Sequence, residues 1–448
     1  MPSLDRIINI IIRNEHGIGT GLGGLVLVNE GIEKIHRSTI GKLTIGMANY
    51  IFGSQKPSDD NILAILPEIM NFEKREDTDY RIRLVNNPLV IGKEDTPIAY
   101  TAPVRVFLDI SDRCTRGPCK HCHTFSSSKN TTVFDWETLE KLSHELGNIG
   151  VFQVKIGGGE PLHPDYVWDR TFPFIKNLRD YGIYVSLSTN GDTLASNIGE
   201  SLSQRLLGLG VKVSVSIDGP EEIHDLIRGE NSYRNTIRAL EVLTHYGIRR
   251  SIATTLMTYN TSVEPISHLA QLASKYDTTL KVRRAKPSRN AAIDDCVISS
   301  PNEEFWKVVK YLNNDCSSKV DVEEIMCLYP SPRPPNDLAF KLYHCGGGIS
   351  TITISPDHSI TPCPFIPFEE KGIKVYNKDG PTLMEVWQEK HIDPNLKFMR
   401  KLTESEDCQE CNKTVYCHGL CPSLRLAYSG NLTGTDPGCP SMLEKMFH

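Results

Sequence analysis

The sequence Cys114-Thr-Arg-Gly-Pro-Cys119-Lys-His-Cys122 places three cysteines within nine residues. Three thiolates at this spacing can hold a [4Fe–4S] cluster and leave one iron without a protein ligand. The stretch also fits half of a zinc site, because C-x2-C pairs are common in zinc ribbons and His121 or His123 offers a fourth ligand. The stretch alone does not decide between iron–sulfur and zinc, so the decision depends on the sequence around it.

The chain after this motif alternates between short apolar strands and amphipathic helices. We expect six strands, at Val104–Ile110, Val151–Ile156, Tyr184–Ser188, Lys212–Ile217, Arg250–Leu256 and Thr279–Arg283. We expect helices between them, at Trp136–Leu146 with Asp135 as N-cap, Tyr166–Tyr181, Leu202–Leu209, Ser232–Tyr246 and Val263–Lys275. This alternation predicts an α/β fold of parallel βαβ units, in which sites form at the carboxyl ends of the strands.

Chemically useful residues follow the ends of these strands. Gly157–Pro161 (GGGEP) follows the second strand, where glycines let a backbone approach a ligand and Glu160 can hold an ammonium group. Arg228, in an Ile-Arg-Gly turn, can clamp a carboxylate. Alone, a glycine-rich turn is usually only a turn, and such an arginine is as often a surface residue. The residues that together suit the amine, carboxylate and ribose of an amino-acid nucleoside are Gly158, Gly159, Glu160, Ser188, Asn190, Ser216, Asp218 and Arg228.

The cysteine motif and these residues, in this order, resemble the radical S-adenosylmethionine (radical SAM) superfamily over residues 104–290. The resemblance implies a partial (β/α)6 barrel in which Cys114, Cys119 and Cys122 hold a [4Fe–4S] cluster. The open iron would bind the methionine part of S-adenosylmethionine. One electron from the cluster would then cleave this cofactor, and the resulting 5′-deoxyadenosyl radical would abstract a hydrogen atom from the substrate.

The resemblance also implies roles for the residues after the strands. Glu160 would contact the amine of S-adenosylmethionine and Arg228 its carboxylate. The ribose would be held by Ser188, Asn190 or Ser216. The family spacing is C-x3-C-x2-C with an aromatic residue before the last cysteine, whereas this chain has a four-residue first gap and carries His121 at the aromatic position. The longer gap leaves the loop conformation open.

A second group of cysteines lies near the other end of the chain. Seven of the 13 cysteines fall between residues 345 and 439. The spacing C-x2-C-x5-C-x3-C from residue 408 resembles the SPASM extension of radical SAM enzymes, which binds two auxiliary [4Fe–4S] clusters; one or two zinc ions are the alternative. The resemblance implies three [4Fe–4S] clusters in all, with a distal auxiliary cluster on Cys408, Cys411, Cys417 and Cys439 and a nearer one on Cys345, Cys363 and Cys421.

The nearer auxiliary cluster has three expected ligands and an open fourth position. Cys327, another side chain, water or the substrate itself could complete it. Otherwise Cys296, Cys316 and Cys327 are interpreted as buried small apolar residues.

Two departures from the family pattern lie near Cys363. The family has a glycine five residues before this position, where this chain has His358. We expect the turn Ser355–Ser359 to form nevertheless, because Asp and His tolerate turn geometry well. Pro364 stands where sulfatase-activating relatives carry an aspartate base, so no catalytic acid or base is assigned.

Three domains are expected: a small α+β domain at residues 1–98, the radical SAM partial barrel at 99–325 and the SPASM domain at 326–448. The first should contain a turn and strand at Gly21–Asn29, a helix at Asn61–Met70 and a strand at Arg83–Ile91. Peptide-maturing members of the family often begin with a winged-helix-like element that adds the substrate's leader to its sheet, and Leu25–Asn29 is the candidate edge strand. A fold-stabilising extension is an equal alternative.

Composition excludes several other classes of protein. The net charge of −6 argues against a broad nucleic-acid footprint. The chain lacks an apolar run of 18 residues, so we expect no membrane span. The apolar run Ile7–Ile12 is too short for a signal peptide, so the cytoplasm is the expected location.

These observations favour a radical SAM maturase that crosslinks, epimerises or excises backbone from a ribosomally synthesised precursor peptide. We expect a leader-bearing peptide substrate and a reducing partner such as ferredoxin or flavodoxin. The first alternative is a radical maturase of a folded protein or of a small cofactor precursor. A lower-ranked alternative is a non-catalytic cysteine-rich binding or electron-transfer module.

Overall fold

The computed structural model describes residues 102–287 with breaks at 104, 150 and 152, most of 295–322 and parts of 346–439. It also describes the backbone of four strands near the N-terminus. The expected helix Asn61–Met70 and the cysteines at 327, 345, 411 and 417 lie outside the described residues.

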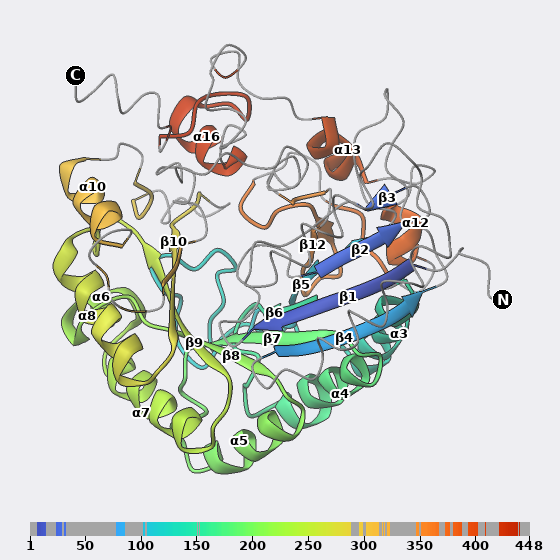
Figure 1. Cartoon of the computed structure of the whole chain (residues 1–448), viewed down its shortest axis with the longest axis horizontal. Helices are drawn as coiled ribbons and strands as arrows, with labels where there is room; N and C mark the ends of the chain where they lie inside the picture. The colour runs from blue at the N-terminus through green and yellow to red at the C-terminus, as the bar shows by residue number, and fades with distance from the viewer. Residues whose placement is uncertain are drawn as a thin grey trace.

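A nine-stranded sheet forms the centre of the molecule (Figure 1), in the order β11-β10-β9-β8-β7-β6-β5-β12-β13. Six of its strands are β5 (Arg105–Asp109), β6 (Gln153–Gly157), β7 (Tyr184–Thr189), β8 (Lys212–Ser216), β9 (Arg250–Leu256) and β10 (Thr279–Arg284). These six are parallel neighbours in chain order, which confirms the six strands expected from the sequence.

The helices between the strands form an outer layer that follows the curve of the sheet in Figure 1. They include α3 (Trp136–Asn148), α4 (Phe172–Asp180), α5 (Gly199–Gly208), α7 (Ser232–His245) and α8 (Val263–Lys275). Asp135 caps α3 as expected, because its side chain accepts the backbone N–H of Thr138 at 2.8 Å. The apolar face of α3 is buried against the core through Leu139, Leu142 and Leu146.

Two helical segments differ from expectation. The single helix expected at Tyr166–Tyr181 begins instead with a π-helical turn, η1 (Val167–Thr171), which leads into α4. A further helix, α6 (Glu221–Arg228), lies between β8 and α7. Arg228 is therefore the last residue of a helix, and its expected position in a turn was wrong.

The sheet extends beyond the six expected strands at both edges. Strand β11 (Val320–Val322) pairs with β10, and β12 (Thr351–Ile354) pairs in parallel with β5. Strand β13 (Ile360–Thr361) forms an antiparallel hairpin with β12. The cysteine-rich segment thus contributes two strands to the same sheet as the barrel.

Helices are also found outside the repeating βαβ units. They are α10 (Glu303–Lys310), α12 (Leu383–Trp387), α13 (Pro394–Lys401) and α16 (Pro422–Ser429). Within the described part of the chain, no helix has the length and apolar character needed to cross a membrane.

The N-terminal strands form a separate four-stranded sheet, in the order β3-β2-β1-β4. They are β1 (Ile7–Asn14), β2 (Gly24–Val28), β3 (Gly31–Ile32) and β4 (Thr78–Val85). Strand β2 confirms the strand expected within Gly21–Asn29, but it pairs with both β1 and β3 and so is not an edge strand of this sheet. The strand expected at Arg83–Ile91 begins earlier and ends at Val85, because it pairs along the whole of β1.

Candidate active site

The loop from Cys114 to Cys122 follows β5 and is fixed by backbone hydrogen bonds. The N–H of Cys114 donates to the carbonyl of Ser127 at 3.1 Å, and the N–H of Cys122 donates to the carbonyl of Cys119 at 3.0 Å. The N–H of Lys120 donates to the carbonyl of Ile227, near the end of α6, at 3.0 Å. The loop with four residues between its first two cysteines is thus tied to the α6 segment that also carries Arg228.

The chemistry of the three thiols fits a cationic iron–sulfur group. The pKa of Cys114 is raised to about 11, mainly by burial and in addition by the nearby Glu160, Cys119 and Cys122. Burial also raises the pKa of Cys119, against the opposing effect of Arg228. Thiols that disfavour one another's ionisation become thiolates when metal ions compensate the charge. Among the described residues, no group of three or more His, Cys, Asp or Glu side chains is arranged to hold a metal ion.

The glycines of GGGEP pack against the chain that leads into the cysteine loop. A Cβ on Gly159 would lie 1.8 Å from the carbonyl oxygen of Arg113, and one on Gly158 would lie 2.4 Å from that of Ser111. The N–H of Gly159 donates to the Ser111 carbonyl at 2.6 Å. Their closest approach in this structure is to another part of the backbone, and their expected approach to a ligand stays a prediction.

Glu160 is fully buried, and both of its carboxylate oxygens accept hydrogen bonds. Oε1 accepts from the N–H of Leu162 at 3.0 Å and from the Thr189 hydroxyl at 2.8 Å. Oε2 accepts from the N–H of Asn190 at 2.8 Å. Burial nevertheless raises the pKa of Glu160 to about 7, because these donors compensate only part of the lost hydration. A cationic ligand group nearby would favour the charged form.

Asn190 joins the end of β7 to the cysteine loop. Its Nδ2 donates to the Thr115 hydroxyl at 2.9 Å and lies 3.5 Å from the Cys114 sulfur. Its carbonyl accepts from the Thr236 hydroxyl of α7 at 2.9 Å. The two Nδ2 contacts hold the side chain beside the first cysteine, and its expected contact with a ribose stays a prediction.

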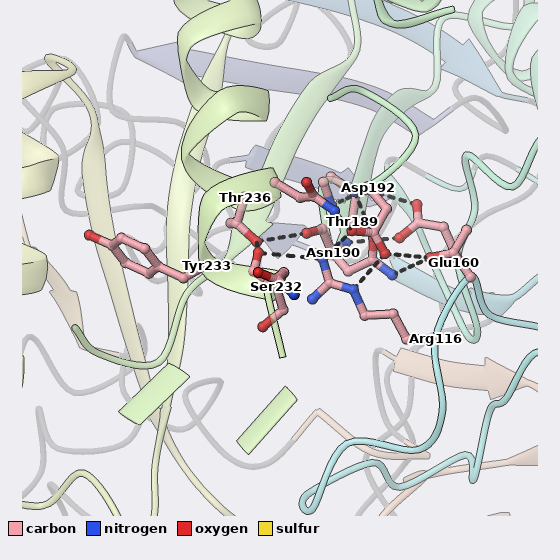
Figure 2. Close-up of polar contacts among 12 residues, drawn as sticks. Arg116, Glu160, Thr189, Asn190, Asp192, Ser232, Tyr233 and Thr236 are labelled. Carbon is pink, nitrogen blue, oxygen red and sulfur yellow. Dashed lines mark hydrogen bonds and ion pairs between the residues drawn. The ribbon is translucent and has the colours of Figure 1, made fainter. Parts of the chain in front are cut away.

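Asp192 is a second anchor of the loop, and no sequence motif indicates it. Figure 2 shows Arg116 and Asp192 directed toward each other beside Asn190. The Arg116 guanidinium donates to both carboxylate oxygens, and Nη2 also donates to the carbonyl of Ser232 at 3.4 Å. Thr115 and Asn235 donate to the same carboxylate at 2.8 Å each. Burial raises the pKa of Asp192, but the bonds from Arg116 outweigh it and the net direction is down.

Arg228 is paired with Asp218 on the other side of the loop. The Arg228 Nε donates to Asp218 Oδ2 at 2.5 Å, and its Nη2 lies 3.0 Å from His121 Nε2. Burial would raise the pKa of Asp218, but Arg228 and then His121 lower it overall. Burial and Arg228 lower the pKa of His121 to about 4. The histidine at the family's aromatic position is therefore neutral at pH 7 and next to the arginine.

The remaining predicted contacts lie at strand ends without a close role in these networks. Ser188 and Ser216 are half-buried at the carboxyl ends of β7 and β8. The structure therefore places Asn190 beside both Glu160 and Cys114, and places Arg228 beside Asp218 and His121.

Asp109 is a buried carboxylate that the sequence reasoning missed. It is the last residue of β5 and is 8% exposed. Burial raises its pKa to about 7, and Lys155 opposes this shift. His123 Nε2 lies 3.9 Å from Asp109 Oδ2, and the His123 ring lies 5.0 Å from that of Phe365 in the C-terminal segment. A carboxyl group with such a pKa can take up or release a proton near neutral pH.

Four of the predicted auxiliary ligands are described. Cys408 is buried, and Cys363, Cys421 and Cys439 are half-buried. Of the cysteines interpreted as apolar packing residues, Cys296 is buried in an apolar cluster and Cys316 packs against the main core.

The turn before Cys363 forms as expected. The N–H of His358 donates to the carbonyl of Ser355 at 2.8 Å, and the hairpin continues into β13. His358 has a φ of 68°, the left-handed conformation that explains why the family places glycine here. Its ring stacks on Phe134 with centroids 4.6 Å apart.

Comparison with known proteins identifies the class to which this fold and this site belong. Residues 108–273 match the model of the Radical SAM superfamily. With its parallel sheet and its cysteine loop after the first barrel strand, the chain is an enzyme of the radical SAM superfamily. Its radical SAM domain implies S-adenosylmethionine and a [4Fe–4S] cluster as cofactors.

Several curated proteins are similar over three quarters of the chain. The mycofactocin maturase MftC of Mycolicibacterium smegmatis is 25% identical over 344 residues, which cover 75% of this chain and 83% of that protein. The PqqA peptide cyclase of Bradyrhizobium diazoefficiens is 23% identical over 367 residues, covering 78% and 88%.

Solved structures share the fold. Streptococcus suis SuiB bound to S-adenosylmethionine has a TM-score of 0.61 at 15% identity, and the match covers 96% of this chain and 98% of SuiB. Native anSMEcpe with bound AdoMet has a TM-score of 0.56 at 18% identity, and the match covers 76% and 95%.

Proposed function

We propose that this chain matures a ribosomally synthesised precursor peptide by radical chemistry. The observation that carries the proposal is the attachment of the cysteine loop to buried Glu160 and Asn190 at the carboxyl ends of parallel strands. Similarity to proteins named as a maturase and a peptide cyclase supports a peptide as the substrate. SuiB, which shares the fold, has also been solved with its precursor peptide SuiA. The change made in the peptide is a crosslink, an epimerisation or a backbone excision.

The three loop cysteines are the proposed ligands of the catalytic cluster. When bound, the cluster and S-adenosylmethionine supply reductive cleavage of the sulfonium and abstraction of a hydrogen atom. Glu160 is the proposed partner of the cofactor's amine, since an ammonium would favour its ionised form. The described residues provide partners for Nε and Nη2 of Arg228 but none for Nη1, which suits a carboxylate. The ribose is assigned to Ser188, Asn190 or Ser216, with Gly158, Gly159 and Asp218 shaping the site.

Two further [4Fe–4S] clusters are proposed for the C-terminal segment, making three in all. Their ligands are Cys408, Cys411, Cys417 and Cys439 for the distal cluster and Cys345, Cys363 and Cys421 for the nearer one. Support comes from the cysteine spacing and from the two strands by which this segment joins the barrel sheet. The catalytic cluster needs an electron donor, for which a ferredoxin or flavodoxin is proposed.

The proposed domains keep the boundaries 1–98, 99–325 and 326–448. Binding of a leader peptide is assigned to the first domain. Strands β3 and β4 are the outer strands of its four-stranded sheet, so a leader would add beside one of them rather than beside β2.

The experiment is co-expression with the short peptide encoded beside the gene, followed by mass spectrometry of that peptide. We expect a mass change with the wild-type chain and none with Cys119→Ala. Cys316→Ala is the matched control and should still modify the peptide, because Cys316 packs against the core outside both cysteine motifs. A purified protein with stoichiometric zinc and no iron would contradict the proposal.

A further inference from the structure

Arg284 and Asp436 form a buried ion pair between the barrel and the cysteine-rich segment. Arg284 is the last residue of β10, and Asp436 lies beyond α16, 152 residues along the chain. Arg284 Nη1 donates to Asp436 Oδ1 at 2.7 Å and Nη2 donates to Oδ2 at 3.2 Å. The two side chains are 3% and 1% exposed. This bidentate geometry fixes both the distance and the orientation of the carboxylate relative to the guanidinium.

The same aspartate contacts two proposed cluster ligands through their backbones. Asp436 Oδ2 accepts the N–H of Cys421 at 3.1 Å. The carbonyl of Asp436 accepts the N–H of Cys439 at 2.9 Å. Cys421 is assigned to the nearer auxiliary cluster and Cys439 to the distal one. One residue therefore fixes a ligand of each cluster, and the barrel fixes that residue.

Apolar packing places this contact near the catalytic loop. Cys421 and Leu424 pack with a small cluster that includes Ile227 and Met257 from the barrel. Ile227 also accepts the N–H of Lys120, which lies between two catalytic cysteines. Cys421 therefore lies beside the apolar surface that also supports the catalytic loop.

Burying two charges is unfavourable unless geometry and further hydrogen bonds compensate for lost hydration. Here the carboxylate receives Nη1, Nη2 and the N–H of Cys421. An apolar contact of the same size would allow the two segments to pack in several relative positions. A bidentate ion pair is satisfied in only one of them. The Arg284–Asp436 pair is thus suited to fixing the positions of the ligand cysteines.

We infer that Asp436, held by Arg284, is a positioning residue. It fixes Cys421 and Cys439 in place for the two auxiliary clusters and fixes their position relative to the barrel. The inference rests on the proposed auxiliary clusters. Its effect is on cluster assembly, and the catalytic cluster should form without it.

The test measures iron content and the electron paramagnetic resonance spectrum of the full-length, anaerobically purified protein. Wild type should hold about twelve iron atoms, four per cluster. Asp436→Ala should lose about four to eight of them, while the spectral change produced by adding S-adenosylmethionine, which reports the catalytic cluster, persists. Asp436→Asn keeps an oxygen that can accept the Cys421 N–H and should retain more auxiliary iron than Asp436→Ala.

Asp357→Ala is the matched control, since Asp357 is a half-exposed carboxylate of the same segment that contacts Lys374 and Ser359. It should keep the wild-type iron content. A wild-type iron content and an unchanged spectrum in Asp436→Ala would overturn the role of Asp436 but not the proposed auxiliary clusters. Loss of the catalytic signal in both Asp436 variants would also overturn it, because the pair would then be a general requirement for folding. Wild-type protein with about four iron atoms would overturn the auxiliary clusters themselves.

Discussion

Asp218 and Asp109 are both buried near the carboxyl ends of parallel strands, yet their environments drive their pKa values in opposite directions. Asp218 follows β8 and is bound by the guanidinium of Arg228, so its pKa falls despite burial. Asp109 ends β5 with His123 at 3.9 Å and Lys155 as its opposing charge, so burial raises its pKa to about 7.

The difference shows that burial disfavours the charged form of both carboxyl groups. The charged partner then determines whether the pKa is finally raised or lowered. A bound guanidinium keeps the carboxylate of Asp218 charged and structural. The weaker compensation at Asp109 leaves a carboxyl group that changes its protonation near pH 7. Both lie at the edge of the sheet where the cysteine loop begins. The site therefore contains one carboxylate that stays charged and one carboxyl group that titrates.

The largest expected effect comes from removing the partner of Asp218. Arg228→Met should leave a buried carboxylate without its cation and lower the free energy of unfolding by about 3–5 kcal/mol. Urea unfolding under anaerobic conditions measures this. Arg234→Met is the matched control, because Arg234 pairs with Glu221 at the surface and such pairs contribute about 0–1 kcal/mol. Equal losses in the two variants would mean that burial does not distinguish the pairs.

A smaller effect, visible as pH dependence, is expected at Asp109. Its pKa is higher in the folded state than in the unfolded state, so its stabilising contribution is complete below about pH 4 and declines until about pH 7. The stability of wild type relative to Asp109→Asn should therefore fall across this window, by at most about 1.4 kcal/mol per pH unit. His123, whose pKa burial lowers to about 4, is neutral over most of this window and contributes little to the change.

The measurement is urea unfolding of both proteins at intervals from pH 4 to pH 8. A difference that stays constant across the window would show that Asp109 does not change protonation there. A pKa below the ordinary value, as at Asp218, would also leave the difference nearly constant, because the change in stability would then lie below about pH 4.

Much of the fold could be predicted because its signals are local. The six barrel strands are short apolar runs separated by amphipathic helices, and the cysteine motif is contiguous. Helix α6 was missed although Glu221 and Glu222 in its first turn are a recognisable start signal. Strand β12 could not be assigned to the barrel, since its parallel pairing with β5 joins segments far apart in the chain.

The site was predictable in composition but not in its contacts. The sequence indicated Glu160 and Asn190, but not that Asn190 would bind the loop of Cys114. Asp192 and Asp109 carry no motif, because an aspartate near a strand end is also common in ordinary turns. Their roles depend on burial and on partners brought together by folding, which a linear pattern does not encode.

The smallest expected effect tests Lys155, a cation of the described part of the chain that opposes the rise in the pKa of Asp109. Lys155 is half-buried on β6, and its Nζ lies 5.7 Å from the ring centroid of Phe107. Lys155→Met should raise the pKa of Asp109 further, by less than about one unit, because a partly solvated charge interacts weakly. The midpoint of the pH window, measured with and without Asp109→Asn in the Lys155→Met background, should move up by that amount. Lys176→Met, which removes an exposed lysine of α4 paired with Asp180, should leave the midpoint in place. A midpoint that moves down would mean that Lys155 acts on Asp109 through packing rather than charge, and the contrast with the arginine-bound Asp218 would then rest on burial alone.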